Sequence, residues 1–222
     1  MYTIIFANGD FRRPTNPLAN VHRAEFLVAA DGGTHHCQEL GVRPDVVVGD
    51  MDSISVDLQD TLEEQGTRFI VHPTDKDETD LELALSYAID NGARQILLLG
   101  LLGGRLDQTL ANLLLLTRPE WQSARLTAAD GPDFAVLLRS GESFNALTRP
   151  GDTLSLIALS REVSGVTTRG LKWPLENATL KFGSTLGVSN QAGGDRAKVT
   201  IAEGQLLVVH RIGEQGPPES DE

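Results

Sequence analysis

Two hydrophobic patterns follow one another along the chain, and their order constrains the fold more than any other feature. Through residues 1–132, short β-branched or leucine-rich runs alternate with longer stretches of helical periodicity. This alternation is typical of parallel sheets whose strands are joined by crossover helices. We therefore predict a three-layer, parallel-sheet α/β domain at residues 1–132. Its expected strands are Thr3–Ala7, Phe26–Ala30, Asp45–Val48, Arg68–His72, Gln95–Leu99 and Ala124–Ala128.

The most clearly marked helix of this domain is expected at Leu81–Asn91. Leu81, Leu85 and Ala88 recur at helical spacing, which places them on one face. Thr79 followed by Glu82 forms a capping-box sequence, and Asn91-Gly92 supplies a stop signal. The capping-box sequence therefore defines the N-terminus of the helix, where the preceding segment joins it.

Residues 133–212 show period-two alternation interrupted by turn residues, with no convincing helix. This pattern predicts a second, all-β domain, best described as an antiparallel β-sandwich. The polar, Pro/Gly-rich residues 213–222 are predicted to be a disordered tail. The expected strands are Phe134–Arg139, Thr153–Leu159, Val163–Arg169, Ala178–Phe182, Ala197–Ala202 and Leu206–Arg211.

The charge of the chain restricts its ligands. The 31 acidic and 19 basic residues give a formal net charge of -12, which disfavours nonspecific nucleic-acid binding. The same charge repels ATP, so a nucleotide enzyme of this composition needs a divalent metal, placed cations or backbone N–H groups at the phosphates. No apolar run reaches the roughly 20 residues of a membrane-spanning helix. With Cys37 as the single cysteine, these features predict a cytoplasmic protein.

Unusual polar residues follow four of the predicted strands. Because ligands of open α/β sheets bind beyond the carboxyl ends of the strands, these loops are expected to share one edge. The four segments are Asp31–Gly33, Gly49–Ser53, Asp75–Asp80 and Gly100–Asp107.

The acidic loops favour a divalent cation. Asp50 and Asp52 are one residue apart after an apolar strand, so both can offer oxygen ligands to Mg²⁺. Acidic loops are also common surface features, and Asp80 at a helix start is stabilised by the helix dipole without any ligand. Clustered carboxylates repel one another unless a cation is present, which favours the metal interpretation.

Glycine-rich loops offer a second set of contacts. The loop with Gly103, Gly104 and Arg105 precedes a helix, so its backbone N–H groups and guanidinium are suited to phosphate oxygens. Neither a Walker A sequence nor G-x-G-x-x-G occurs. Asn8-Gly9-Asp10 and Asp31-Gly32-Gly33 are either tight turns or further phosphate contacts. In the β part, Trp173 is either a core residue or an aromatic platform for a cationic ring.

Taken in order, these segments resemble the motifs of the thiamine pyrophosphokinase family. The resemblance spans nearly the whole chain, because two further segments of the β part resemble the family's thiamine-binding segments. The matching segments are Ala30–Gly33, Gly49–Ser53, Asp77–Asp80, Gly103–Asp107, Gly170–Trp173 and Gly187–Asn190.

The resemblance implies transfer of diphosphate from ATP to the thiamine hydroxyl, with Mg²⁺, in a homodimer. It implies that residues 1–132 bind ATP and metal, and that residues 133–212, from the partner subunit, contribute to the thiamine site. The implied metal ligands are Asp50, Asp52 and Asp80. The implied catalytic residues are Asp77, Asp80, Arg105 and Asp107. The implied phosphate-binding residues are Asn8, Asp31, Gly32, Gly33, Lys76, Gly103, Gly104 and Arg105. The implied thiamine contacts are Trp173, Ser189 and Asn190.

Two other functions remain alternatives at this point. The run from Val46 to Ser53 superficially matches an aspartate-nucleophile phosphohydrolase, in which Asp50 would form an aspartyl-phosphate. A non-catalytic nucleotide- or thiamine-binding module would use the same contacts. Release of AMP in the presence of ATP, Mg²⁺ and thiamine distinguishes the kinase from both.

Overall fold

The computed structural model describes residues 1–16 and 19–213. The chain divides into two units: unit 1 is Met1–Gly131, and unit 2 begins at Pro132. Of the predicted tail, residues 214–222 lie outside the described residues. Gly213 is described, and its N–H donates a 2.8 Å hydrogen bond to Asp152 Oδ1.

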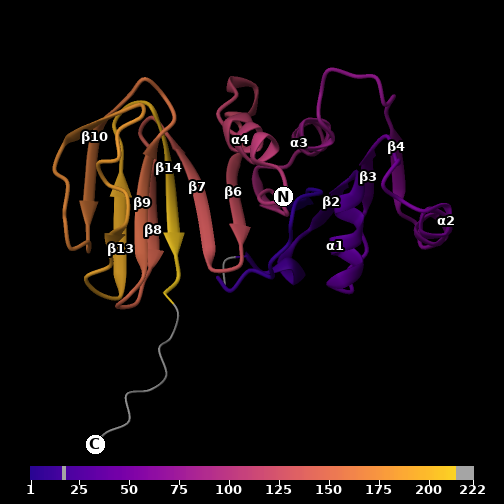
Figure 1. The fold of residues 1–222 in the computed structure, drawn as a ribbon, viewed down its shortest axis with the longest axis horizontal. Helices are drawn as coiled ribbons and strands as arrows, with labels where there is room; N and C mark the ends of the chain where they lie inside the picture. The colour runs from indigo at the N-terminus through magenta and orange to yellow at the C-terminus, as the bar shows by residue number, and fades with distance from the viewer. Residues whose placement is uncertain (17–18, 214–222) are drawn as a thin grey trace, which may run out of the picture. The chain divides into compact units, whose positions relative to one another are not determined.

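Unit 1 is built on a parallel sheet (Figure 1). Within the unit, the order of the strands is β6-β5-β1-β2-β3-β4, and every neighbouring pair is parallel. The strands are β1 Tyr2–Phe6, β2 Phe26–Ala30, β3 Val46–Gly49, β4 Arg68–Val71, β5 Gln95–Leu99 and β6 Arg125–Asp130.

Helices cover both faces of this sheet, with α1 and α3 on opposite faces (Figure 1). The Thr79 side chain caps α3 by accepting from the Glu82 N–H, as its sequence predicts, and Ser55 caps α2 in the same way. The α-helices are α1 Thr34–Glu39, α2 Val56–Glu64, α3 Asp80–Asp90 and α4 Leu106–Leu115. Short 3-10 helices occupy Val21–Arg23, Asp31–Gly33 and Pro119–Trp121.

The centre of the sheet is apolar on both sides. In β1, the consecutive residues Ile4, Ile5 and Phe6 are all 0% exposed. Successive side chains of a strand point to opposite faces, so complete burial of neighbours requires cover on both faces. This is why the strands of unit 1 appear in the sequence as continuous apolar runs rather than alternating ones.

The strand order reverses at β1. The chain proceeds outward from β1 through β2 and β3 to β4, and then returns to place β5 on the other side of β1. The loops after β1 and β5 therefore follow neighbouring strands at the point where the strand order reverses, which is where ligands of such sheets bind.

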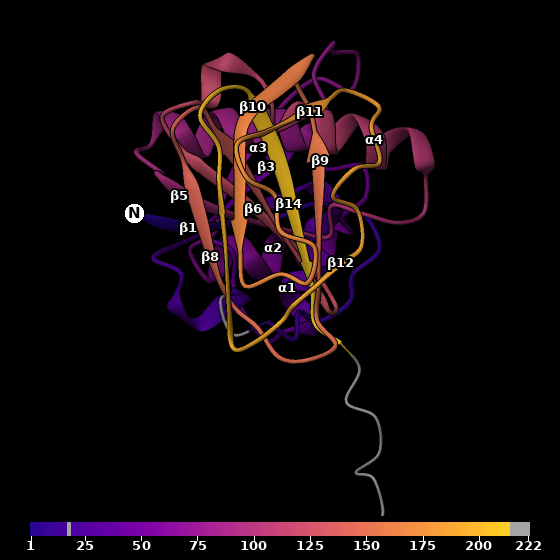
Figure 2. The same cartoon turned by 90° about the vertical axis from the view of Figure 1, so that its left-hand side faces the viewer.

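Unit 2 contains two antiparallel sheets. Figure 2 looks toward the one that contains β8, β10 and β11, whose order is β11-β10-β13-β8. The other has the order β12-β9-β14-β7 within this unit. Phe134 of β7 and Phe144 of β8 stack with ring centroids 6.2 Å apart, so the inner faces of the sheets form a shared core. The strands are β7 Asp133–Arg139, β8 Ser143–Leu147, β9 Thr153–Ala158, β10 Glu162–Arg169, β11 Ala178–Lys181, β12 Asn190–Gln191, β13 Arg196–Thr200 and β14 Gln205–Arg211.

The α/β plus antiparallel-β fold class is confirmed, and each predicted strand corresponds to an observed one with ends shifted by at most a few residues. Two strands were not predicted. Strand β8 alternates over only five residues, and β12 has two, which is too short for a periodic signal. The position of the boundary between predicted domains stays a prediction.

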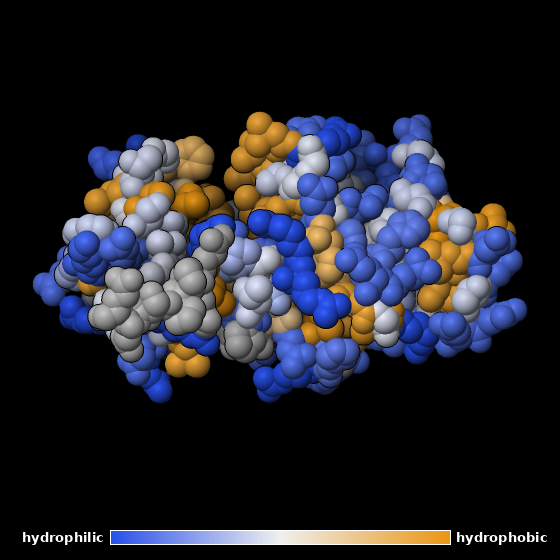
Figure 3. Space-filling view, turned by 60° about the horizontal axis from the view of Figure 1, so that its bottom comes forward, coloured by the Kyte–Doolittle hydropathy of each residue, from blue (hydrophilic) through white to orange (hydrophobic). Residues whose placement is uncertain are grey.

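The hydrophilic residues on the surface agree with the many charged residues in the chain. On the face shown in Figure 3, apolar side chains gather in separate patches among hydrophilic ones. In the described residues, no helix is long and apolar enough to cross a membrane.

A buried charged network holds the turn before β9 against the end of β14. The Asp152 carboxylate accepts hydrogen bonds from the N–H groups of Gly213 and Arg149 and lies 2.9 Å from His210 Nε2. Burial alone would raise the pKa of Asp152, but these hydrogen bonds outweigh it, so that the pKa is lowered. The Asp152 carbonyl also accepts from the Ala192 N–H, which ties this network to the segment around β12.

Replacing Asp152 with asparagine is expected to lower the free energy of unfolding by about 1–3 kcal/mol at pH 7, because an amide NH₂ replaces one accepting oxygen. A folded-state pKa below the unfolded value of about 3.9 stabilises the protein above that pH, and the stabilisation is lost as pH falls through the folded pKa. The difference between Asp152→Asn and wild type should therefore shrink below about pH 4.

Urea unfolding followed by circular dichroism at pH 7 and at acidic pH measures this difference. Asp195→Asn, an exposed aspartate of the same unit, is the matched control and should behave as wild type at both pH values. A difference between Asp152→Asn and wild type that stays constant with pH would contradict the role of the carboxylate charge.

Candidate functional site

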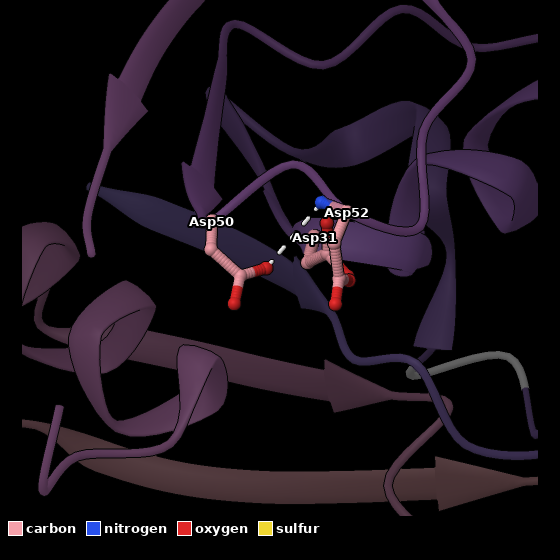
Figure 4. A group of neighbouring side chains, drawn as sticks. All are labelled: Asp31, Asp50 and Asp52. Carbon is pink, nitrogen blue, oxygen red and sulfur yellow. Dashed lines mark hydrogen bonds between the residues drawn. The ribbon is translucent and has the colours of Figure 1, made fainter. Parts of the chain in front are cut away.

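Three carboxylates meet at the carboxyl edge of the sheet in unit 1. Asp31 follows β2, whereas Asp50 and Asp52 follow β3. Each offers an oxygen, and these oxygens all lie within 4.8 Å of one another. Figure 4 shows the three carboxylates directed into one space. Hard oxygen ligands at this separation are suited to a divalent cation such as Mg²⁺.

The backbone at this edge is held in an uncommon conformation. Asp31 and Met51, which lies between the other two carboxylates, have φ values of 43° and 65°. Left-handed φ costs a non-glycine residue roughly 1–2 kcal/mol. Such strain persists where the surrounding structure fixes it, and it is concentrated at functional sites.

One oxygen in the group has no partner among the described residues. Asp31 is 3% exposed, and its Oδ1 is buried without a hydrogen bond. A buried carboxylate oxygen in that state is destabilised unless a cation or a donor reaches it. The residues present therefore fit a bound metal ion, with Asp31 joining Asp50 and Asp52.

Lys76 is the cation closest to this group. Its Nζ lies 3.1 Å from Asp80 Oδ1 and 3.4 Å from Asp50 Oδ2, and its side chain is only 12% exposed. Burial would lower the pKa of Lys76, but the interactions with Asp80 and Asp50 outweigh it and raise the pKa. The ammonium therefore stays charged and partly offsets the repulsion among the carboxylates.

The pKa values of Asp50 and Asp80 are shifted in opposite directions. Burial would raise the pKa of Asp50, but hydrogen bonds from the Asp52 N–H and Lys76 outweigh it, and the pKa is lowered. The pKa of Asp80 is raised, chiefly by burial and further by the charges of Asp50 and Asp31, although Lys76 opposes the shift. Asp80 thus belongs to the same acidic cluster. It is bound by Lys76, and it is not one of the three residues whose oxygens lie within 4.8 Å of one another.

Asn8 and Gly32 meet beside this cluster. A Cβ on Gly32 would lie 2.3 Å from Asn8 Oδ1, so any larger residue would displace the Asn8 side chain. The structure therefore brings the loop after β1 directly against the Asp31-Gly32-Gly33 turn.

The glycine loop after β5 is held by Asp10. Asp10 Oδ2 accepts a 3.0 Å hydrogen bond from the Gly104 N–H, and a Cβ on Gly103 would lie 2.4 Å from the same oxygen. Gly103 and Gly104 have φ values of 90° and 65°. One N–H group of this loop therefore already binds an anionic acceptor, the Asp10 carboxylate.

Arg105 and Asp107 are exposed at the start of α4. Their side chains are 67% and 66% exposed and form an ion pair with each other. Exposed ion pairs of this kind are weak because solvent screens both charges, so Arg105 can exchange Asp107 for another anionic partner. Asp77 is also exposed and lies three residues before Asp80, which joins the acidic cluster.

In unit 2, the predicted thiamine segments meet through Asn190. The Asn190 side chain accepts from the Trp173 N–H at 3.1 Å and donates to the Trp173 carbonyl at 2.6 Å. Asn190 is 3% exposed and pairs with Leu154 of β9. Its buried amide therefore fixes the Trp173 backbone to the sheet.

The Trp173 ring itself is accessible. Trp173 is 53% exposed, which contradicts the interpretation of this residue as part of the core, whereas Trp121 is 3% exposed. Lys172 Nζ lies 4.7 Å from the centroid of the Trp173 ring. The ring face thus already accepts a cation, the property that binding a cationic ring requires.

Ser189 precedes the buried Asn190 in a left-handed conformation, with φ of 58°. Its N–H donates a 3.0 Å hydrogen bond to Ser155 Oγ of β9. The structure therefore brings Trp173, Ser189 and Asn190 together in unit 2, whereas the other predicted site residues gather in unit 1.

Sequence reasoning missed several residues of these sites. Asp10 and Lys172 were named only within longer segments and given no role of their own, and Asp31 was assigned to phosphate rather than to the group of close carboxylates. A signal for Asp10 was present, because it lies in the loop after the first strand, at the same edge as the others. Lys172 carries no signal beyond its position next to Trp173.

Comparisons with known proteins cover both units. Residues 19–128 match the family model described as thiamin pyrophosphokinase, catalytic domain, and residues 143–206 match the one described as thiamin pyrophosphokinase, vitamin B1 binding domain. Thiamine pyrophosphokinase 2 of Arabidopsis thaliana is 30% identical, over 99% of this chain and 90% of the relative. Thiamine pyrophosphokinase of Bacillus subtilis is 29% identical, over 82% and 85%.

Solved structures agree with these relatives. The crystal structure of thiamin pyrophosphokinase from Geobacillus thermodenitrificans superposes with a TM-score of 0.79 and 27% identity, over 97% of this chain and 99% of the other. The Bacillus subtilis enzyme superposes with a TM-score of 0.82 at 24% identity, over 96% and 99%, which shows the same fold. With its catalytic and vitamin B1 binding segments both matched, and with a relative at 30% identity that covers 99% of it, this chain belongs to the thiamine pyrophosphokinase family.

Proposed function

We propose a division of roles among the residues of this enzyme, which is a thiamine diphosphokinase transferring diphosphate from ATP to the thiamine hydroxyl and releasing AMP. In this proposal the edge of the parallel sheet in unit 1 holds the triphosphate and a metal ion. The Trp173 segment of unit 2 holds thiamine. The observation that carries the proposal is the convergence of Asp31, Asp50 and Asp52 at the carboxyl edge of the sheet.

The metal assignment rests on charge and geometry. Asp50 and Asp52 are the proposed Mg²⁺ ligands together with Asp80, and the buried, unpartnered oxygen of Asp31 makes Asp31 a further candidate. A bound Mg²⁺ would neutralise charge on the triphosphate and polarise its phosphorus–oxygen bonds. The carboxylates supply hard oxygen ligands, and the loops that carry them have a constrained backbone at Asp31 and Met51.

Lys76, Arg105 and the Gly103-Gly104 loop are the proposed phosphate contacts. Lys76 already bridges Asp50 and Asp80, so a small movement of its flexible side chain transfers the ammonium to a phosphate oxygen. Arg105 is exposed and weakly paired with Asp107, which leaves it free to reorganise. Asn8, Gly32 and Gly33 shape the wall beside the cluster.

The chemical step is an in-line attack of the thiamine hydroxyl on the β-phosphorus. The new oxygen–phosphorus bond forms as the bond to the AMP oxygen breaks, and the hydroxyl proton must leave. Asp77 and Asp80 are the candidate acceptors. Asp77 is favoured over Asp80 because it is exposed, whereas Asp80 is engaged with Lys76.

Thiamine carries a cationic thiazolium, which suits an acidic protein and an open indole face. Trp173 is the proposed stacking surface, Asn190 positions it, and Ser189 lies beside it. An incoming cation can take the place that Lys172 holds over the ring.

The homodimer is proposed from the resemblance and from an apolar stripe on α4. Leu106, Leu110 and Leu114 recur at four-residue spacing on one face of the helix and are 75%, 53% and 49% exposed. Contiguous exposed apolar surface marks an interaction site, and a second copy of this chain is the proposed partner. A cytoplasmic location also stays a prediction, supported by the single cysteine, Cys37, which is buried and free.

The two alternative functions receive no support from the comparisons. A phosphohydrolase would use Asp50 as a nucleophile, but the Asp50 carboxylate is paired with Lys76 and shares the acidic cluster. A binding module would show no turnover. Incubation with ATP, Mg²⁺ and thiamine should yield AMP and thiamine diphosphate in equal amounts, whereas inorganic phosphate or a trapped phosphoenzyme would indicate the hydrolase.

The variants Asp50→Asn and Asp52→Asn should each lower turnover by at least about 100-fold, because each loses a charged metal ligand. Both variants should stay folded. Asp52→Asn should melt at about the wild-type temperature, whereas Asp50→Asn loses the charge that pairs with Lys76 and should melt at a slightly lower temperature. Chromatography of AMP and thiamine diphosphate measures turnover, with circular dichroism as the test of folding. Asp60→Asn, an exposed aspartate of α2, is the control and should retain full activity. Folded, fully active Asp50→Asn would refute the metal assignment.

Replacing Trp173 with alanine should raise the KM for thiamine about tenfold through loss of the stacking face, while Trp173→Phe should retain most of the affinity. The KM for ATP should change little in both variants. Steady-state kinetics with each substrate varied in turn provides the measurement. Phe182→Ala, which removes another exposed aromatic ring of unit 2, is the control. Equal increases in both KM values would argue against a thiamine contact.

The double variant Leu110→Lys/Leu114→Lys should convert a dimer into a monomer, because two charges would enter the proposed apolar contact. Light scattering at several protein concentrations measures the mass. Val56→Lys adds a charge at a position that is 72% exposed on α2 and should leave the dimer intact. A wild-type chain that is monomeric and fully active would end the dimer proposal.

A further inference from the structure

A second polar site lies on the sheet of β8, β13 and β10, within unit 2. It is a hollow of about 400 Å³ whose lining combines basic, amide and apolar side chains. Its volume falls within the range of small-molecule sites, about 300–1,000 Å³. None of its residues is among those assigned above to ATP, metal or thiamine. The lining residues are Asn145, Ala146, Leu147, Arg169, Arg196, Ala197 and Lys198.

The strand register places the basic side chains on one face. Lys198 of β13 pairs with Asn145 of β8 on one side and with Arg169 of β10 on the other. Residues paired across strands share a face of the sheet, and so do residues two apart on one strand. Arg196, two residues before Lys198 and paired with Leu147, therefore joins this face. All three basic residues are exposed, whereas the intervening Ala197 is 3% exposed.

These cations have little local compensation. Among the described residues, neither Arg196 nor Lys198 forms an ion pair, and the partner of Arg169 is Glu176 at 3.1 Å. Both members of that pair are more than half exposed, with side chains 65% and 76% accessible, so the contact is weak and exchangeable. Three basic groups thus face one hollow on a chain whose net charge is -12.

The lining defines the chemical class of ligand. Arg169 and Arg196 offer planar guanidinium groups that bind phosphate oxygens through paired hydrogen bonds, and Lys198 adds a point charge. The Cβ atoms of directly paired residues such as Arg169 and Lys198 lie about 5 Å apart, so their long side chains can reach two phosphoryl groups of one ligand. Leu147, which is 74% exposed, offers an apolar wall for the organic part of the ligand.

We propose that the hollow formed by Asn145, Leu147, Arg169, Arg196 and Lys198 is a binding site for a diphosphate-bearing small molecule, separate from the transfer site. Glu176 is the acidic side chain in contact with the lining, and acidic groups more than about 8 Å from the hollow have little effect because their charges are largely screened at physiological ionic strength. The proposal stands on this face of unit 2 alone and does not depend on the roles proposed for the transfer site.

Titration of the ¹⁵N-labelled, full-length protein with inorganic pyrophosphate, in EDTA to remove divalent metal, tests the site. The amide signals of β8, of β13 and of Arg169 should shift and saturate, and the affinity should fall with salt. The variant Arg196→Gln/Lys198→Gln should bind about tenfold or more weakly, because two charge-assisted contacts are lost. Arg196→Gln alone should show an intermediate loss, which provides a second test if the double variant folds poorly.

The control Arg161→Gln/Lys181→Gln removes the same charge from exposed positions of unit 2 outside the hollow. It should bind pyrophosphate within about twofold of wild type, because only long-range attraction changes. ADP and free phosphate provide separate arms. Tighter saturation by ADP than by free phosphate supports an organic diphosphate as the ligand, and preference for free phosphate overturns that assignment.

Three results would overturn the proposal outright. One is that pyrophosphate shifts only signals of the Gly103-Gly104 loop; another is that β8 and β13 show no saturation at millimolar pyrophosphate. The third is that Arg196→Gln/Lys198→Gln changes the molecular mass in light scattering while pyrophosphate leaves these strands unperturbed. In that case the basic face would be a protein interface.

Discussion

The parallel pairing of β1 with β2 on one side and β5 on the other determines where the proposed phosphate site lies. Because both faces of β1 are buried, its loop can leave only at the carboxyl edge, where the Gly9 N–H donates to the Gly100 carbonyl at 2.8 Å. That contact joins the loops on the two sides of the switch point. The Asp31 turn and the Asp50–Asp52 loop then follow the next two strands of the same edge.

Acidic side chains clustered at this edge repel one another unless other groups compensate their charges, and the local structure responds to this repulsion. Lys76 sits between Asp50 and Asp80, and burial and neighbouring charges raise the pKa of Asp80. The arrangement is maintained by strands whose apolar residues are fully buried, so the free energy of the core offsets the repulsion. A stable scaffold thereby keeps charges together that would separate on a flexible chain, and the ligands of the proposed metal ion are already assembled.

The sequence was sufficient to predict the fold class and most strands, because apolar runs and period-two alternation report burial directly. It also placed Asp50, Asp52 and the glycine loop at one edge, since strand ends in a parallel sheet share an edge. It could not predict which carboxylates approach one another most closely. The left-handed turn at Asp31 and the pairing of Lys76 with Asp80 depend on tertiary packing, and β12 is too short to leave a pattern.

The hydrogen bond from Gly104 to Asp10 has a consequence for selectivity among anions. An N–H group that already has a carboxylate partner gains little from a weakly accepting ion such as chloride, which would leave Asp10 displaced and unpaired. The triphosphate proposed to bind here would bring several strong acceptors at once, and the cations that accompany it would compensate Asp10. In this proposed role, Asp10 would favour polyvalent anions, because it competes with any single weak acceptor for the Gly104 N–H.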